Sequence, residues 1–153
     1  MSSVLAGWAS DRWIARGAPP TRVRKTFVVT GLAVASLILP VGMVPNLAVS
    51  IGLLIIVYLA FGLFSSNHWA ITQTLAGAKA SGKWTGLQNA FANLGGVIAP
   101  FLTGLILSKT GSYFLAFLSS SVIVLIGVAC YLFVVGKVQP VRWTRYLEAV
   151  EHS

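Results

Sequence analysis

The chain has 153 residues, of which 56% are hydrophobic and 9% are charged, and its mean hydropathy is +0.83. Ordinary soluble domains carry roughly one quarter charged residues, so this composition excludes a water-soluble globular protein. Eleven Lys and Arg residues stand against three Asp and Glu residues, and no acidic residue occurs between Arg12 and Glu148.

Four long apolar blocks occupy most of this acid-free stretch. They lie at 27–44, 47–64, 87–107 and 113–135. Each approaches the ~20 residues that an α-helix needs to cross the hydrocarbon core of a bilayer. Every backbone polar group must be bonded internally in lipid, and no alternating pattern marks barrel strands, so helices are the expected spanning element. We predict an all-α integral membrane fold with four transmembrane helices, at about 27–44, 47–76, 86–108 and 113–136.

The distribution of positive charge predicts the orientation. Ten of the eleven basic residues fall in three segments that four crossings place on one side, and Lys109 alone falls on the other. Cytoplasmic loops retain Lys and Arg. We therefore predict a cytoplasmic loop at 1–25, a transmembrane region at 26–136 and a cytoplasmic tail at 137–153, in the cell inner (plasma) membrane. The basic loops lack the interleaved aromatic residues of a nucleic-acid interface, so no nucleic-acid partner is predicted.

The first predicted helix contains Pro40 and ends at Pro45 and Asn46, which predicts a tight hairpin into the second helix. A proline frees a carbonyl of the preceding turn, and neighbouring helices can bond that carbonyl in a membrane bundle. Pro40 therefore predicts a kink. The single cysteine, Cys130, lies in the fourth block and allows no disulfide framework, so we interpret it as a packing residue.

The second predicted helix ends in a polar stretch, which must face protein or water. Its polar members are Ser65, Ser66, Asn67, His68, Thr72, Gln73 and Thr74. A loop, GAKASGKWTG, precedes the third helix, which opens with Gln88, Asn89 and Asn93 and continues with a row of small or kinking residues at four-residue spacing, Ala92, Gly96, Pro100 and Gly104. That row favours close packing of a neighbouring helix, with a hinge as the other interpretation.

The first 25 residues contain G-x-x-x-D-R-x-x-x-R, formed by Gly7, Asp11, Arg12 and Arg16. The glycine allows a neighbouring helix to approach, and Asp11 can accept hydrogen bonds from a helix N-terminus or from an arginine. The pattern resembles the loop motif of the major facilitator superfamily, although Ile14 replaces its second glycine and Ala15 one basic residue. The other interpretation is a solvated charge cluster that fixes topology.

Farther along, S-x-x-W, G-x-x-N-x-x-x-N-x-x-G, P-x-x-x-G and T-G-S-Y follow in order. This series resembles the tenth to twelfth helices of the anion:cation symporter family, which includes proton-coupled permeases for sugar acids. The resemblance implies that Ser66, Trp69 and Asn89 line a central cavity and hydrogen-bond an organic anion. From the residues alone, Ser66 and Asn89 could equally bond neighbouring helices, and Trp69 could be an interfacial anchor.

The resemblance implies the C-terminal part of a proton-coupled symporter for a sugar acid such as a hexonate or hexuronate, covering about the ninth to twelfth helices and inactive alone. Its expected partners are a small organic anion, protons, the lipid bilayer and the missing N-terminal helices. His68 is the one membrane-embedded group we consider for titration, because the family's usual Asp, Glu and Arg would lie in the missing half.

Two alternatives stay open: a small oligomeric four-helix multidrug-type exporter, and a non-transporting membrane remnant or partner protein. Such exporters depend on a membrane-embedded glutamate, which the predicted helices lack. No nucleophile with a base, metal cluster or phosphate-binding loop is recognisable, so the sequence predicts neither an enzyme nor a cofactor or metal.

Overall fold

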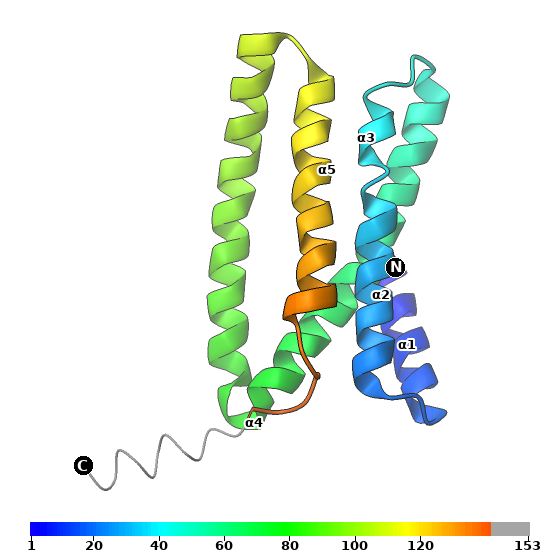
Figure 1. Ribbon diagram of the computed structural model, residues 1–153, viewed down its shortest axis with the longest axis vertical. Helices are drawn as coiled ribbons and strands as arrows, with labels where there is room; N and C mark the ends of the chain where they lie inside the picture. Colours follow the sequence, from blue (N-terminus) through cyan, green and yellow to red (C-terminus); the bar gives the residue numbers. More distant parts are fainter. Residues whose placement is uncertain (142–153) are drawn as a thin grey trace, which may run out of the picture.

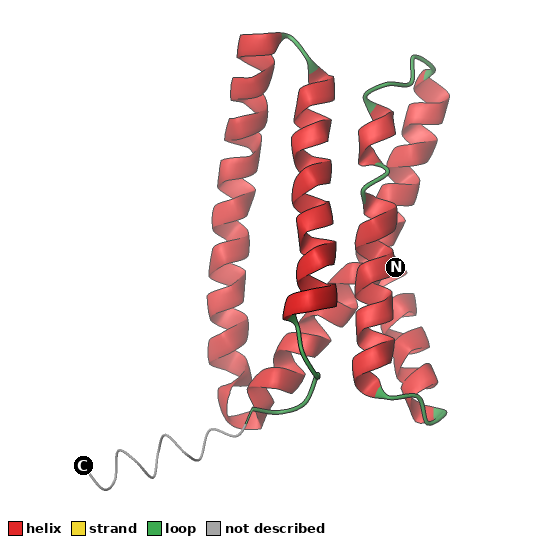
Figure 2. Cartoon of the chain, viewed as in Figure 1, coloured by secondary structure: helices red, strands yellow, loops and turns green. Residues whose placement is uncertain are grey.

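The computed structural model describes residues 1–141, and these form helices, turns and loops without a strand, which confirms the all-α prediction. Figures 1 and 2 show the arrangement. The elements are α1 (Ser2–Ala15), α2 (Pro20–Ala35), α3 (Ile38–Val41), α4 (Leu47–Thr110), α5 (Tyr113–Ala129) and the π-helix η1 (Cys130–Val134).

Three helical stretches are long and apolar enough to cross a membrane: Pro20–Val41, Leu47–Thr110 and Tyr113–Val134. The longest is a hairpin, because Gly77 has φ 68° and ψ 175° in its interior and reverses the chain there. Its first arm, 47–76, and its second arm, 78–110, each exceed the ~20 residues of one crossing. The structure is thus consistent with the four predicted crossings (Figure 1).

The Gly77 turn differs from the predicted ten-residue loop. The helix resumes directly after this glycine, so the third helix begins before the predicted residue 86. Glycine can adopt this backbone conformation because it has no Cβ, and one such residue suffices to reverse the direction of the chain. The following AKASGK segment is rich in Ala and Lys, which are strong helix formers, so it continues the helix although it reads as polar.

The N-terminal segment also differs from expectation. Residues 1–25 are predicted as a cytoplasmic loop, whereas α1 covers 14 of these residues and only 16–19 connect it to α2. Gly17 turns the connection at φ 94°. Pro20 is the first residue of α2, a position where the missing N–H of proline costs nothing. The first predicted helix, expected at about 27–44, therefore starts earlier, at Pro20.

Pro40 interrupts its helix as predicted. Regular helix ends at Ala35 and resumes as the short α3, which contains Pro40. The carbonyl four residues before a proline loses its intrahelical donor, and here that carbonyl belongs to Ser36. The Ser121 hydroxyl of α5 donates to it at 3.3 Å, and the Ser121 side chain is buried. The Ser36 carbonyl also accepts from the Leu39 N–H at 3.2 Å, so α5 adds a second bond to a carbonyl that residue 40 cannot reach with an N–H.

Two short turns, one before α4 and one after it, lie at the upper end of the molecule in Figure 1. Asn46 precedes α4 and its side-chain oxygen accepts from the backbone N–H groups of Ala48 at 2.9 Å and Val49 at 3.3 Å, a helix N-cap. Gly111 ends α4 with φ 64° and donates its N–H to the Leu107 carbonyl at 2.8 Å. Both turns therefore hold antiparallel neighbours without a long loop.

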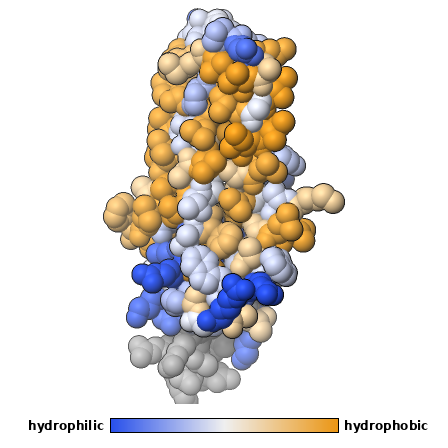
Figure 3. All heavy atoms as spheres, turned by 90° about the vertical axis from the view of Figure 1, so that its right-hand side faces the viewer, coloured by the Kyte–Doolittle hydropathy of each residue, from blue (hydrophilic) through white to orange (hydrophobic). Residues whose placement is uncertain are grey.

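A small core joins α2, the first arm of α4 and the residues after η1. It consists of Val28, Leu32, Ile71 and Val138, with partly buried aromatic and aliphatic side chains around it. The outer surface is largely apolar above a hydrophilic lower end (Figure 3). That distribution suits a protein surrounded by lipid over most of its height.

The second arm of α4 packs least. Residues 89–105 are exposed throughout, and a Cβ added to Gly96 or Gly104 would meet nothing within 4 Å. The row of small residues predicted to pack against a helix thus has no partner within residues 1–141. Its interpretation as a packing surface remains a prediction.

Candidate functional site

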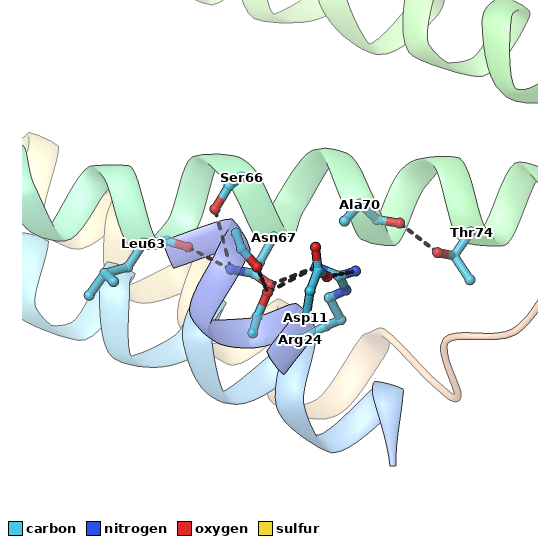
Figure 4. A network of polar contacts seen from close by, with 9 residues as sticks. Asp11, Arg24, Leu63, Ser66, Asn67, Ala70 and Thr74 are labelled. Atoms are coloured by element: carbon cyan, nitrogen blue, oxygen red, sulfur yellow. Dashed lines mark hydrogen bonds and ion pairs between the residues drawn. The ribbon is translucent and has the colours of Figure 1, made fainter. Parts of the chain in front are cut away.

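Arg24 of α2 forms hydrogen bonds to side chains on both α1 and α4 (Figure 4). Its guanidinium donates to the Asp11 carboxylate of α1 at 2.8 Å. The other terminal nitrogen donates to the Ser10 hydroxyl at 3.1 Å and to the Asn67 side-chain oxygen of α4 at 3.2 Å. Arginine carries five N–H donors in a planar fork, so one side chain on α2 can bond α1 and α4 at once.

Asn67 is fully buried, and its amide has protein partners at both ends. Besides accepting from Arg24, it donates to the Leu63 carbonyl at 3.2 Å and to the Ser66 hydroxyl at 3.3 Å. Ser10 is equally buried and donates to the Gly7 carbonyl at 2.9 Å. Arg24, Ser10 and Asn67 thus bond one another across three helices, and the buried polar atoms of Ser10 and Asn67 have partners within the protein.

The predicted motif residues therefore occupy different environments. Asp11 pairs with Arg24, a residue outside the motif. Arg12 lies over the Trp8 ring at 5.4 Å, within the range of a cation–π contact. Arg16 is the C-cap residue of α1. A Cβ added to Gly7 would lie 3.8 Å from the Ser66 Cβ, so the glycine does meet a neighbouring helix.

No hydrogen bond joins the three predicted substrate residues to one another. Ser66 is half-buried between the Asn67 amide and the Gly62 carbonyl. Trp69 is half-buried beside the His68 ring, at 5.7 Å between centroids. Asn89 is exposed, and its backbone carbonyl accepts from the Asn93 side chain at 2.9 Å. The structure leaves the Asn89 amide available to a solute, and the substrate role of all three remains a prediction.

A second polar cluster surrounds His68, which the sequence singled out only as a titratable residue. One ring nitrogen, Nδ1, contacts the Tyr131 hydroxyl of η1, and the other, Nε2, contacts the Gln88 side chain of the second arm. The ring also stacks on Phe64, with centroids 4.9 Å apart and planes 25° apart. Tyr131 belongs to a π-helix, and π-helical turns are often found at functional sites. No sequence motif predicts this π-helix.

A cavity of ≈ 440 Å³ lies between the two arms of α4 near their Gly77 turn. Thr72 and Gln88 are the polar side chains of its lining. The remaining wall is apolar, from Leu75, Ala76, Trp84, Leu87, Phe91 and Val141. Gln88 therefore belongs both to the cavity wall and to the His68 cluster.

The last described residues, 137–141, form hydrogen bonds to α2 and to the first arm of α4. The Val138 N–H donates to the Thr21 hydroxyl of α2 at 3.0 Å, and the Val141 N–H donates to the Leu75 carbonyl of α4 at 2.9 Å. This segment, 137–141, thus joins the start of α2 to the end of the first arm. The rest of the predicted tail, with Arg142 and Arg145, lies outside the described residues.

Comparison with known proteins agrees with the helical arrangement. The chain is 30% identical over 90% of its length to the uncharacterized transporter YybO of Bacillus subtilis (strain 168), and covers 32% of that protein. It is 31% identical over 93% of its length to the "Probable galactarate/D-glucarate transporter GudP" of Escherichia coli (strain K12), covering 31% of it. It is 27% identical over 90% of its length to the D-galactonate transporter of Escherichia coli O6:H1, covering 32%.

The chain thus spans about a third of the length of each of these relatives. The profile of the Major Facilitator Superfamily matches residues 1–148, which includes all the described helices. With its all-α architecture, its membrane-spanning helices and this match along nearly the whole sequence, the chain belongs to the Major Facilitator Superfamily.

Proposed function

We propose that this chain forms the C-terminal part of a proton-coupled symporter for an organic anion of the sugar-acid class, such as a hexonate or hexuronate. Relatives named as transporters of galactarate, D-glucarate or D-galactonate align over about nine tenths of the chain, and this observation carries the proposal. The chain needs the N-terminal helices of the same transporter, because major facilitator proteins alternate access by moving two bundles around a site between them.

We assign Ser66, Trp69 and Asn89 to the wall that faces the transported anion. The contact between Gln88 and His68 supports this assignment, because it places the start of the second arm beside the polar part of the first arm. Asn89, one residue on, then lies at a depth close to that of Trp69. Neutral hydroxyl, indole and amide groups hydrogen-bond a hydroxylated anion without adding a buried charge.

The lower end of the molecule is assigned to the cytoplasm of an inner-membrane protein. The start of the chain differs from the predicted cytoplasmic position, because Ser2 lies beside Gly62 near the middle of the first arm of α4 (Figure 1). The connection between α1 and α2 and the Gly77 turn lie at this end (Figure 1), and hydrophilic side chains gather there (Figure 3). Arg16, Lys79 and Lys83 lie in or next to these turns and are exposed. Retention of positive charge in the cytoplasm supports the orientation.

Uptake in proteoliposomes tests the proposal. The 153-residue chain alone and the chain rejoined to its upstream coding sequence are compared with labelled hexonates, hexuronates and amphipathic cations. Sugar-acid uptake by the rejoined protein alone is expected. Saturable uptake by the chain alone would show a complete oligomeric transporter, and uptake of cations instead of acids would favour the exporter alternative.

Substitutions in the rejoined protein test the site. Trp69→Ala and Asn89→Ala are expected to abolish uptake while the protein still inserts. Asn93→Ala is the matched control, since Asn93 lies one turn farther on and its amide donates to its own helix. Unchanged uptake in both site variants would defeat the assignment.

A further inference from the structure

We propose that His68 is a proton-binding site within these helices, in which Gln88 and Tyr131 accept the two ring N–H groups of the charged imidazolium. Both contacts bring in side chains from outside the first arm of α4, one from its second arm and one from η1. The inference extends the proton-coupling part of the proposed function to a group in the C-terminal helices.

The amide of Gln88 can donate to the ring Nε2 when this nitrogen carries no hydrogen, and it can accept from Nε2 when it does. With Nε2 of Gln88 against Nε2 of His68, the Gln88 oxygen Oε1 is buried and has no hydrogen-bond partner among residues 1–141. Rotating the amide by half a turn exchanges its nitrogen and oxygen. The oxygen then accepts from the ring Nε2–H, and the buried acceptor gains a partner.

The Tyr131 hydroxyl can also serve either form, because it both donates and accepts. When it donates to Nδ1, the ring is neutral and carries its hydrogen on Nε2. When a proton binds at Nδ1, the hydroxyl hydrogen turns away and the oxygen accepts instead. Uptake of one proton then leaves both ring N–H groups bonded, and the ring gains one positive charge. A charge in the membrane region requires such compensation.

The aromatic surroundings favour the charged form further. Phe64 presents its face to the imidazole ring, with centroids 4.9 Å apart, and an aromatic face attracts a cation. No carboxylate contacts His68 within residues 1–141, where Asp11 is the acidic residue and pairs with Arg24. Arg24 reaches Asn67, which lies about 100° around the helix from His68. Within the part of the chain that the structure describes, Tyr131 is therefore the titratable neighbour of His68, and no cation contacts the ring.

The cavity between the arms of α4 lies beside the His68 cluster. Gln88 lines this cavity and contacts His68, so one hydrogen bond separates the ring from a space of ≈ 440 Å³. Thr72, the other polar lining residue, donates to the backbone carbonyl of His68 at 3.2 Å.

Nuclear magnetic resonance of ¹⁵N-histidine in the 153-residue chain, held in phosphatidylcholine nanodiscs, tests the inference without requiring transport. The His152→Ala substitution leaves His68 as the one histidine. Between about pH 8 and pH 5, both ring nitrogens are expected to become protonated. A ring that stays neutral over this range would overturn the proposal.

Two variants separate proton binding from packing. Gln88→Leu removes one acceptor of the charged ring and is expected to weaken proton binding about tenfold or more, because hydrogen bonds to charged groups are among the stronger ones. Gln73→Leu is the matched control, since Gln73 is exposed on the same arm as His68, and its titration should equal that of the parent chain. If His68 took up its proton over the same pH range in the parent chain and in Gln88→Leu, the role of the amide as an acceptor would be contradicted. Failure of the rejoined protein to take up sugar acids would overturn the proposed function and leave this titration as it stands.

Discussion

Arg24 of α2 donates a hydrogen bond at 3.2 Å to Asn67 of α4, whose side chain is fully buried. The ion pair of Arg24 with Asp11 contributes less, because the Asp11 side chain is 65% exposed and exposed ion pairs are worth little. The stabilisation by Arg24 therefore comes mainly from the acceptors of Ser10 and Asn67.

Replacing Arg24 should loosen the packing of α1 and α2 on α4. We expect Arg24→Gln to lower the free energy of unfolding by roughly 1.5–3 kcal/mol, since it removes charge-assisted bonds to buried acceptors. Denaturant titration in detergent micelles measures the loss. Arg22→Gln is the control, because Arg22 is exposed on the same turn. Equal destabilisation by both variants would show that only net charge matters.

Ser121→Ala tests the bond that compensates for Pro40. The variant leaves the Ser36 carbonyl without the α5 hydroxyl, and we expect a loss of about 1 kcal/mol in the free energy of unfolding. Ser119→Ala is matched to it, because the Ser119 hydroxyl donates within its own helix to Ala116 at 2.8 Å. The idea fails if thermal unfolding temperatures fall by the same amount in both variants.

α2 and α4 approach each other closely at Gly31. A Cβ at this position would lie 2.7 Å from the Phe64 backbone nitrogen and 2.8 Å from the Ala60 carbonyl oxygen, and backbone atoms cannot rotate away. Gly31→Ala should therefore destabilise the protein by about 1–3 kcal/mol. Gly52→Ala, where a Cβ meets nothing within 4 Å, should be neutral or stabilising by up to about 1 kcal/mol. Denaturant titration of both variants measures the free energy of unfolding, and a Gly31→Ala variant as stable as the parent chain would contradict the expected clash.

Gly77→Ala should strain the turn between the arms of α4. A φ of 68° with a ψ of 175° is essentially restricted to glycine and costs other residues roughly 1–3 kcal/mol. Gly82→Ala serves as the comparison, since Gly82 is helical and open on all sides. We expect a lower yield of folded protein on size-exclusion chromatography for Gly77→Ala only. A normal elution profile would mean that the turn adopts another conformation.

Cysteine labelling tests the orientation. In a Cys130→Ala background, Gly82→Cys should react with an impermeant maleimide only when the cytoplasmic face is exposed, and Thr110→Cys should react from the opposite face. The two positions lie at opposite ends of the second arm of α4, and both are exposed. The reverse labelling pattern would invert the assigned topology.

The membrane class, the helical fold and the Pro40 interruption could be predicted because each follows from local composition. Lipid requires continuous apolar segments, and Pro40 removes a donor wherever it stands in a helix. The turn at Gly77 could not be placed, because its polar flanks are compatible with a loop or a helix. Its single-residue form depends on tertiary contacts of the two arms.

The candidate site was predictable in part. Ser66 and Trp69 are three residues apart, so they share a face of one helix. The pairing of Asp11 with Arg24 depends on how α1 and α2 lie against each other, which spacing within α1 cannot reveal. The contact of His68 with Tyr131 joins residues 63 positions apart, and it needs the π-helix that rotates the end of the last crossing. The sequence gives no local sign of either contact.

The one-residue turn at Gly77 also constrains movement. A long loop would let two helices slide past each other at their connected ends, whereas a single-residue turn allows little such movement. The segment 137–141 adds a second tie, through the Leu75 carbonyl close to the turn. The lower ends of the two arms must therefore be displaced as one body, and any change in their mutual tilt pivots about this point and is largest at their far ends, Leu47 and Thr110.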